Sequence, residues 1–179
     1  MAALPLTFVD RKLIDTPVVG PDGAVFYTLT STHGFRGRKV TTIMAASGLV
    51  GIINWREDHF IINGVERKWD QIRARSGGIF SSEREWNWDG RPYTLKYHHS
   101  NKELLATPNF NSVAGTVRFT TYDTHLFHEN ERAVLYLPSQ MQDEIERMFL
   151  LMAILQTEMH RQDKQRGARN AGAIAAASA

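Results

Sequence analysis

The feature that most constrains this chain is a run of eight apolar residues, MFLLMAIL, at positions 148–155. The surrounding sequence predicts that this run belongs to a helix over residues 139–166. Ser139 followed three residues later by Gln142 matches a capping box, and Gly167 is a natural helix stop. Acidic residues near the start and basic residues near the end complement the dipole of such a helix.

Helical geometry makes the 148–155 segment apolar in every direction. Phe149 and Met152 belong to one stripe, while Leu151 and Ile154 lie on the opposite side. Such a helix has to be surrounded by protein or by lipid. Because eight residues are far fewer than the roughly 20 that cross a bilayer, we expect no transmembrane segment. We predict instead that the rest of the chain encloses this helix.

The segment before the helix has the pattern of many short strands. Turn signals that tolerate positive φ, such as Pro21-Asp22-Gly23, Asn63-Gly64 and Asp89-Gly90, separate stretches of alternating apolar and polar residues between positions 4 and 137. Roughly ten to twelve strands fit, at the spacing of an all-β sandwich or barrel. Closure of these strands around the helix would bury it and leave no exposed sheet edge.

The fold predicted for residues 1–166 is therefore a single mainly β domain. It is a closed antiparallel β-barrel of about 12 strands around a central C-terminal hydrophobic α-helix. The length of 179 residues and the hydrophobic content of 42% are those of one globular domain. Residues 167–179 are small and Ala-rich, and we expect them to form a disordered tail.

Composition removes several functional classes. The chain has no cysteine, which excludes disulfides, a thiolate nucleophile and cysteine-bound metal centres. A formal net charge of +2 is too small to indicate a nucleic-acid-binding protein. The N-terminal residues lack the basic and apolar regions of a secretory signal. We therefore expect a cytoplasmic protein, with peripheral attachment to a membrane left open.

Three segments resemble a known family: GLVGIINW at positions 48–55, WDGRPYTLK at positions 88–96, and the apolar-then-basic helix at 141–166. Together they resemble a fungal family of uncharacterised domains in the tubby-like superfamily, which also contains the plant LURP-one-related proteins and the phospholipid scramblases. The resemblance extends over residues 4–166 in the order of the elements. It implies a closed barrel of twelve strands around a central C-terminal helix, and known roles in the superfamily include binding of phosphoinositide lipids.

Two basic segments are the candidate sites for an anionic ligand. The first, at positions 33–39, places Arg36, Arg38 and Lys39 beside two glycines and Phe35. Glycine lets backbone N–H groups approach an anion, and the planar guanidinium of arginine matches phosphate. The second segment contains Arg73 and Arg75, which strand alternation places on one face. The alternative for both is an ordinary solvated surface.

Histidines support a different hypothesis, an enzyme with an unfamiliar site at a barrel mouth. The candidates are His98, His99, His125 and His128. An HxxH pair without a predicted helix is a weak metal signal, and the sequence lacks a nucleophile elbow and a dinucleotide-binding glycine pattern. We therefore assign no catalytic residue, no metal and no cofactor.

A third hypothesis is a lipocalin-like carrier of a small molecule, with the helix outside a hollow barrel. It predicts that Leu150, Leu151, Ala153 and Ile154 cannot all be buried. The hypothesis we favour from the sequence is a non-enzymatic binding module, whose partner is an anionic phospholipid head group or another protein.

Overall fold

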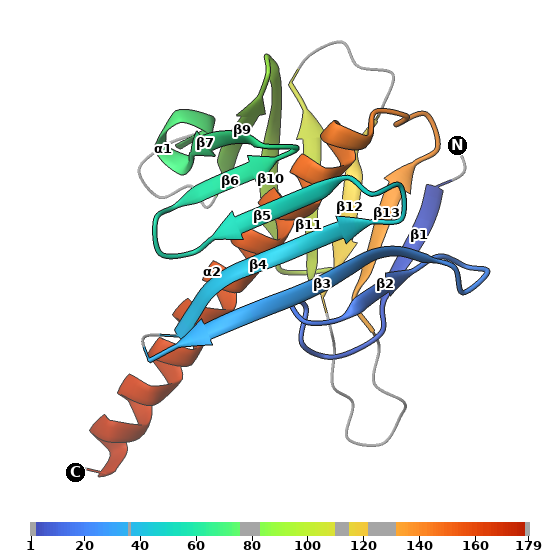
Figure 1. Cartoon of the computed structure of the whole chain (residues 1–179). Helices are drawn as coiled ribbons and strands as arrows, with labels where there is room; N and C mark the ends of the chain where they lie inside the picture. The colour runs from blue at the N-terminus through green and yellow to red at the C-terminus, as the bar shows by residue number, and fades with distance from the viewer. Residues whose placement is uncertain (1–2, 36, 76–82, 110–114, 122–131, 178–179) are drawn as a thin grey trace.

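The computed structural model of this chain describes residues 3–35, 37–75, 83–109, 115–121 and 132–177, with side chains described as far as residue 168. Over these residues the chain is mainly β: thirteen strands form one antiparallel sheet, and a long C-terminal helix passes through its concave side (Figure 1). The elements are β1 (Ala3–Phe8), β2 (Pro17–Val19), β3 (Val25–Gly34), β4 (Gly37–Ala45), β5 (Val50–Asn54), β6 (His59–Ile62), β7 (Val65–Lys68), α1 (Trp69–Ile72), β8 (Arg73–Arg75), β9 (Arg84–Trp88), β10 (Arg91–His98), β11 (Glu103–Pro108), β12 (Val117–Thr120), β13 (Val134–Pro138) and α2 (Glu144–Ala177).

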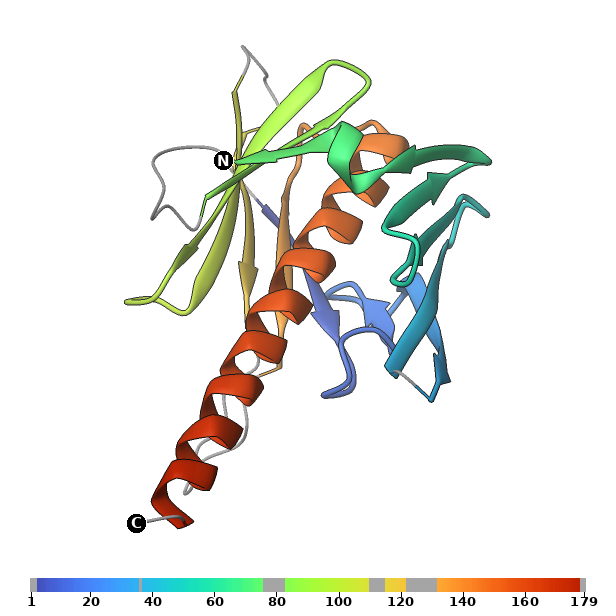
Figure 2. The ribbon, with the colours of Figure 1, turned by 90° about the vertical axis from the view of Figure 1, so that its left-hand side faces the viewer.

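The strand order is that of two meanders joined in the middle of the sheet. It runs β7-β6-β5-β4-β3-β2-β1-β13-β12-β11-β10-β9-β8, so the first and last described strands of the chain pair with each other. In Figure 2 the strands from the two halves of the chain lie on opposite sides of α2. The sheet therefore surrounds α2, and its two edges are β7 and β8.

Hydrogen bonds do not close this sheet, so it differs from the closed barrel predicted from the sequence. The odd number of described strands explains the difference. All twelve described pairings are antiparallel, so β7 and β8, at the two ends of the order, run in the same direction. Parallel neighbours need a connection of about a dozen residues or more. Only the four residues of α1 separate these strands, so the chain itself spans the gap.

Two predicted hairpins are confirmed. Asn63 and Gly64 have φ angles of 49° and 79° and join β6 to β7, while Asp89 and Gly90 have the same pair of values and join β9 to β10. Positive φ at both central residues is the geometry of a type I′ turn, which asparagine, aspartate and glycine favour.

Enclosure of the helix is also confirmed. None of the residues 148–155 exposes more than 1% of its surface, and this holds for Leu150, Leu151, Ala153 and Ile154, contrary to what the hollow carrier predicts. Strand β5 approaches α2 so closely that a methyl group on Gly51 would lie 2.6 Å from the sulfur of Met148. Within the described part of the chain, neither helix has an apolar stretch long enough to cross a bilayer.

The ends of α2 differ from the predicted bounds of 139–166. The helix begins at Glu144 because the side chain of Asp143, and not that of Ser139, accepts the first free backbone N–H groups, at 2.9 Å from Ile145 and 3.2 Å from Glu146. It continues past Gly167 to Ala177, over the segment expected to be a disordered tail. The alanines after Gly167 are the strongest helix formers, and a single exposed glycine does not end the helix.

Candidate functional site

Two neighbouring cavities lie where α2 leaves the sheet, and we call this part of the molecule the open end. Their volumes are about 580 and 770 Å³, and Trp69, Gln156 and His160 line both. The smaller cavity is bounded by the β3–β4 hairpin and α2, and we call it the Arg38 cavity. The larger one is bounded by α1, β8, β9 and α2, and we call it the Arg73 cavity.

In the Arg38 cavity the arginine is held in place and neutralised. Arg38 forms an ion pair with Asp163 of α2, and its guanidinium lies 5.1 Å from the centre of the Trp55 ring. The Trp55 indole is fixed in turn by its Nε1–H, which donates to Thr41 Oγ1 at 2.8 Å. The β3–β4 hairpin is thereby attached to α2, and Arg38 contributes little surplus charge.

Arg73 is the unusual cation of the larger cavity. It faces Trp86 across the β8–β9 pair, and its guanidinium lies 5.5 Å from both the Trp86 and the Trp69 ring centres. This half-buried guanidinium has no carboxylate partner among the described residues. Burial lowers the pKa of Arg73 below its usual value, and the nearby charge of Arg84 lowers it further, while Asp58 opposes both effects.

The other charges of the Arg73 cavity do not cancel this one. Glu158 is buried and is occupied by a two-bond contact from Arg161, with both N–O distances at 2.7 Å. The lining also contains the cations Arg75, Arg84 and Lys164 and the carboxylates Asp58 and Asp70. Arg84 donates to the backbone carbonyl of Glu83 at 2.8 Å and is not counted as surplus charge. After the Arg161–Glu158 pair is also set aside, Arg73, Arg75 and Lys164 face two carboxylates in this cavity. The balance favours an anion.

His160 lies between the two cavities. The residue is largely exposed, but the part of the ring that is buried lowers its pKa below the usual value. The cations Lys164 and Arg73 lower this pKa further, while Asp163 raises it. The neutral imidazole therefore predominates near neutral pH, and an anion in either cavity would favour its protonation.

The structure brings together most of the predicted basic residues. Arg73 and Arg75 line one cavity and Arg38 lines the other, although the two segments are distant in sequence. Lys39 is exposed on β4 and lies outside both linings. Arg36 lies outside the described residues. Arg84 could not be recognised from the sequence, because the β8–β9 register that places it opposite Arg75 was not predicted. His160 and Lys164 were missed because only the path of α2 brings them to this cavity.

The predicted histidines do not form a site in the described structure. His98 and His99 lie at the end of β10 and line neither cavity, while His125 and His128 lie outside the described residues. Among the residues that the structure describes, no three histidine and carboxylate side chains are grouped in a way that could hold a metal ion.

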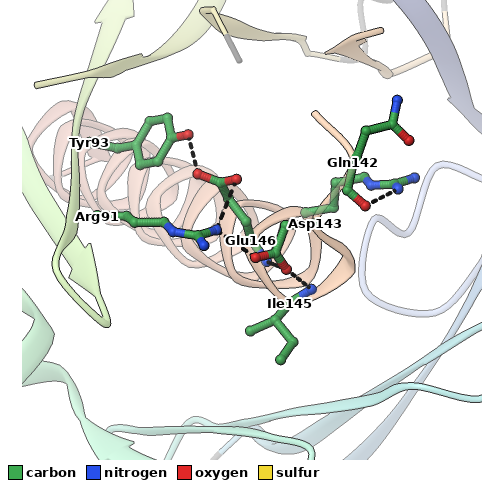
Figure 3. A network of polar contacts seen from close by, with 7 residues as sticks. Arg91, Tyr93, Gln142, Asp143, Ile145 and Glu146 are labelled. Carbon is green, nitrogen blue, oxygen red and sulfur yellow. Dashed lines mark hydrogen bonds and ion pairs between the residues drawn. The ribbon is translucent and has the colours of Figure 1, made fainter. Parts of the chain in front are cut away.

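The opposite end of the sheet, where α2 begins, contrasts with the open end, and we call it the closed end. Figure 3 shows Asp143, which caps α2, and Glu146 of α2 facing Arg91 and Tyr93 of β10. Arg91 donates to Asp143 at 2.6 Å and to Glu146 at 3.2 Å, and the Tyr93 hydroxyl donates to Glu146 at 2.7 Å. The cavity there measures only about 110 Å³. This network attaches the start of α2 to the sheet.

Comparison with known proteins gives a family without an assigned activity. The model of a family of unknown function, DUF6593, matches residues 11–158. Since this match includes nearly all the described strands and the buried part of α2, the chain belongs to that family. No curated protein and no solved structure matches the chain.

Proposed function

We propose that this DUF6593 chain is a non-enzymatic binding module, and that the Arg73 cavity binds the phosphorylated head group of an anionic phospholipid. The observation that carries the proposal is Arg73 itself: a half-buried cation between two indole rings, without a carboxylate partner among the described residues. A buried charge is costly unless it is paired. A bound phosphate would supply the missing partner.

The chemistry of the lining fits a phosphate group. A guanidinium donates two parallel hydrogen bonds to phosphate oxygens, and partial burial makes such bonds stronger than in water. Trp69 and Trp86 restrict the orientation of the Arg73 side chain, so little conformational entropy is lost on binding. Arg75 and Lys164 add positive charge to the same cavity.

The filled interior of the sheet supports a binding role over catalysis. Residues 148–155 of α2 occupy the space in which a hollow barrel would hold a substrate, so a ligand has to bind at an end or on the outside. We further propose a tubby-like barrel, completed through α1 in place of a β7–β8 pair, and a cytoplasmic protein that attaches to membranes peripherally.

The test is flotation of the purified chain with two kinds of vesicle: phosphatidylcholine alone, and phosphatidylcholine with phosphatidylinositol bisphosphate. We expect flotation only with the second kind. Titration with soluble inositol trisphosphate, followed by tryptophan fluorescence because two indoles flank Arg73, separates head-group binding from membrane adsorption.

The informative variant is Arg73→Met, which keeps an unbranched apolar side chain and removes the charge. We expect it to weaken inositol trisphosphate binding about tenfold or more, the usual effect of losing a hydrogen bond to a charged group. The matched control is Arg118→Met, since Arg118 also stacks on an aromatic ring, 4.1 Å from the Tyr136 centre, but on a different part of the sheet. Equal flotation with both vesicles, or unchanged binding by Arg73→Met, would refute the proposal and favour a protein partner.

A further inference from the structure

The tip of the β3–β4 hairpin presents a fully exposed aromatic ring. Phe35 has a relative exposure of 106%, while the next most exposed large apolar residue among those described, Met44, has 54%. The tip lies at the open end, and the adjoining Gly37 and Arg38 line the Arg38 cavity (Figure 1). Transfer of a phenyl ring from water to an apolar medium is favourable. This position therefore needs a reason.

Cations lie near the hairpin tip that carries this ring. The guanidinium of Arg56 lies against Gly34, where an added methyl group would overlap Arg56 Nη2. Lys39 is exposed on β4, close to the same tip. Within the described chain, neither Arg56 nor Lys39 has an ion-pair partner. The lack of a side chain at Gly34 thus lets a cation lie against the backbone next to Phe35.

Two acidic residues lie near the tip, and one of them is neutralised. Asp163 pairs with Arg38. Glu57, next to Arg56 in sequence, accepts a hydrogen bond from Asn54 at 2.8 Å and lies 3.7 Å from His59 Nδ1. Since Asp163 is neutralised, Arg56 and Lys39 outnumber Glu57 near this tip, and one apolar side chain projects from it.

From this arrangement we infer that the β3–β4 tip is a membrane anchor: Phe35 inserts into the interfacial region of an anionic bilayer while Arg56 and Lys39 contact lipid phosphates. Each cation near an anionic membrane surface contributes attraction, and an inserted ring adds apolar burial. A single ring on a hairpin tip lacks the contiguous apolar core of a stable protein interface, so a bilayer is the partner that fits. This inference rests on the proposed function, because it places the Arg73 cavity at a membrane surface.

The absence of cysteine makes the inference directly testable. Phe35→Cys introduces a single thiol, to which an environment-sensitive fluorophore is attached. The matched control is Val25→Cys, at the other end of β3, where the native side chain is 48% exposed. On addition of vesicles of phosphatidylcholine, phosphatidylserine and phosphatidylinositol bisphosphate, we expect a blue-shifted, brighter emission from position 35 and no change from position 25.

A second variant, Phe35→Ala in the otherwise native chain, separates anchoring from head-group recognition. We expect it to weaken partitioning onto the same vesicles about tenfold, the effect of withdrawing a phenyl ring from lipid. Binding of soluble inositol trisphosphate should be unchanged. The inference is wrong if Phe35→Ala floats as the native chain does, if it loses trisphosphate binding equally, or if both labelled positions respond alike.

Failure of the anchor and failure of the proposed function give different results. If the native chain binds inositol trisphosphate and floats while position 35 does not respond, only the anchor is refuted. If the native chain neither binds inositol trisphosphate nor floats, both proposals are refuted.

Discussion

The two ends of the sheet that α2 passes through differ in how their charges are matched. At the closed end, Arg91 and Tyr93 of β10 donate to the helix cap Asp143 and to Glu146, and a cavity of only about 110 Å³ remains. At the open end, two cavities of about 580 and 770 Å³ flank the helix, and Arg73 has no carboxylate partner among the described residues. At both ends, polar side chains contact α2.

The difference separates stability from binding. Where each charge meets its counterpart within the protein, the contact fixes the helix and leaves little for a ligand. Where positive charge remains without a counterpart, the protein gives up some stability and gains affinity for an anion. Substitutions at the closed end should therefore affect unfolding, while substitutions at the open end should affect binding.

The largest effect on the free energy of unfolding is expected from a substitution of Phe149, which lies beneath the closed end. Its ring lies 5.7 Å from that of Trp88 and 6.5 Å from that of Trp86, and it is 1% exposed. Phe149→Ala should lower the free energy of unfolding by about 3–5 kcal/mol, because it leaves a cavity that the surrounding sheet cannot fill. Urea denaturation measures this loss. A loss below about 1 kcal/mol would mean that the sheet does not enclose the helix tightly.

The next largest effect on the free energy of unfolding is expected from a substitution of Arg91. Arg91→Ala removes a partner from both Asp143 and Glu146, and the Glu146 side chain is only 9% exposed. We expect a loss of about 1–3 kcal/mol in the free energy of unfolding, with little change in inositol trisphosphate binding. Arg91→Lys keeps the charge and should lose less. Equal effects on stability and binding would contradict the division between the two ends.

A smaller, pH-dependent effect is expected at Asp143. Burial raises its pKa, but the hydrogen bonds from Arg91 and from the backbone of Glu146 and Ile145 outweigh this and hold the pKa below its usual value. The stabilisation is therefore present above the usual carboxyl pKa and is lost as the pH falls through the lowered one.

Asp143→Asn keeps the helix cap and removes the charge, so at neutral pH it should cost about 0.3–1 kcal/mol. The difference from the native chain should shrink towards zero as the solution is acidified. Urea is the denaturant to use, since a guanidinium salt would screen the charge. A difference that stayed constant down to acidic pH would show that the carboxylate charge does not stabilise the start of α2.

The smallest effect on stability is expected at Arg73. Because burial and Arg84 disfavour its charge, Arg73→Met should change the free energy of unfolding by no more than about 0.5 kcal/mol, or raise it slightly. The same variant should lose the increase in melting temperature that inositol trisphosphate gives the native chain. A strong destabilisation would identify Arg73 as a structural residue.

Local sequence patterns predicted the features that depend on nearby residues. The all-round apolar segment at 148–155 was correctly predicted to be enclosed, and Asn63-Gly64 and Asp89-Gly90 were correctly predicted as hairpin turns. The unclosed sheet was not predicted, because it depends on the parity of the strand count. The start of α2 was misplaced because two capping signals, Ser139 and Asp143, lie four residues apart and the contact with Arg91 favours the second.

For the candidate site, the sequence identified cations but not their surroundings. Arg38 and Asp163 are 125 residues apart, so their pairing depends on the path of α2. The position of Arg73 between two indoles depends on its register opposite Trp86. Whether an arginine is neutralised, as Arg38 is, or left with surplus charge, as Arg73 is, follows from contacts distant in sequence and could not be read from composition.

The position of α2 after all the described strands has a consequence for biosynthesis. Chains emerge from the ribosome N-terminus first, at roughly 5–20 residues per second, so every strand is available before the segment that fills the sheet. Until residues 148–155 arrive, the inner apolar side chains of the strands have nothing to pack against. We therefore expect the nascent chain to depend on chaperones until translation has passed α2, and to reach its stable form in a late, cooperative step.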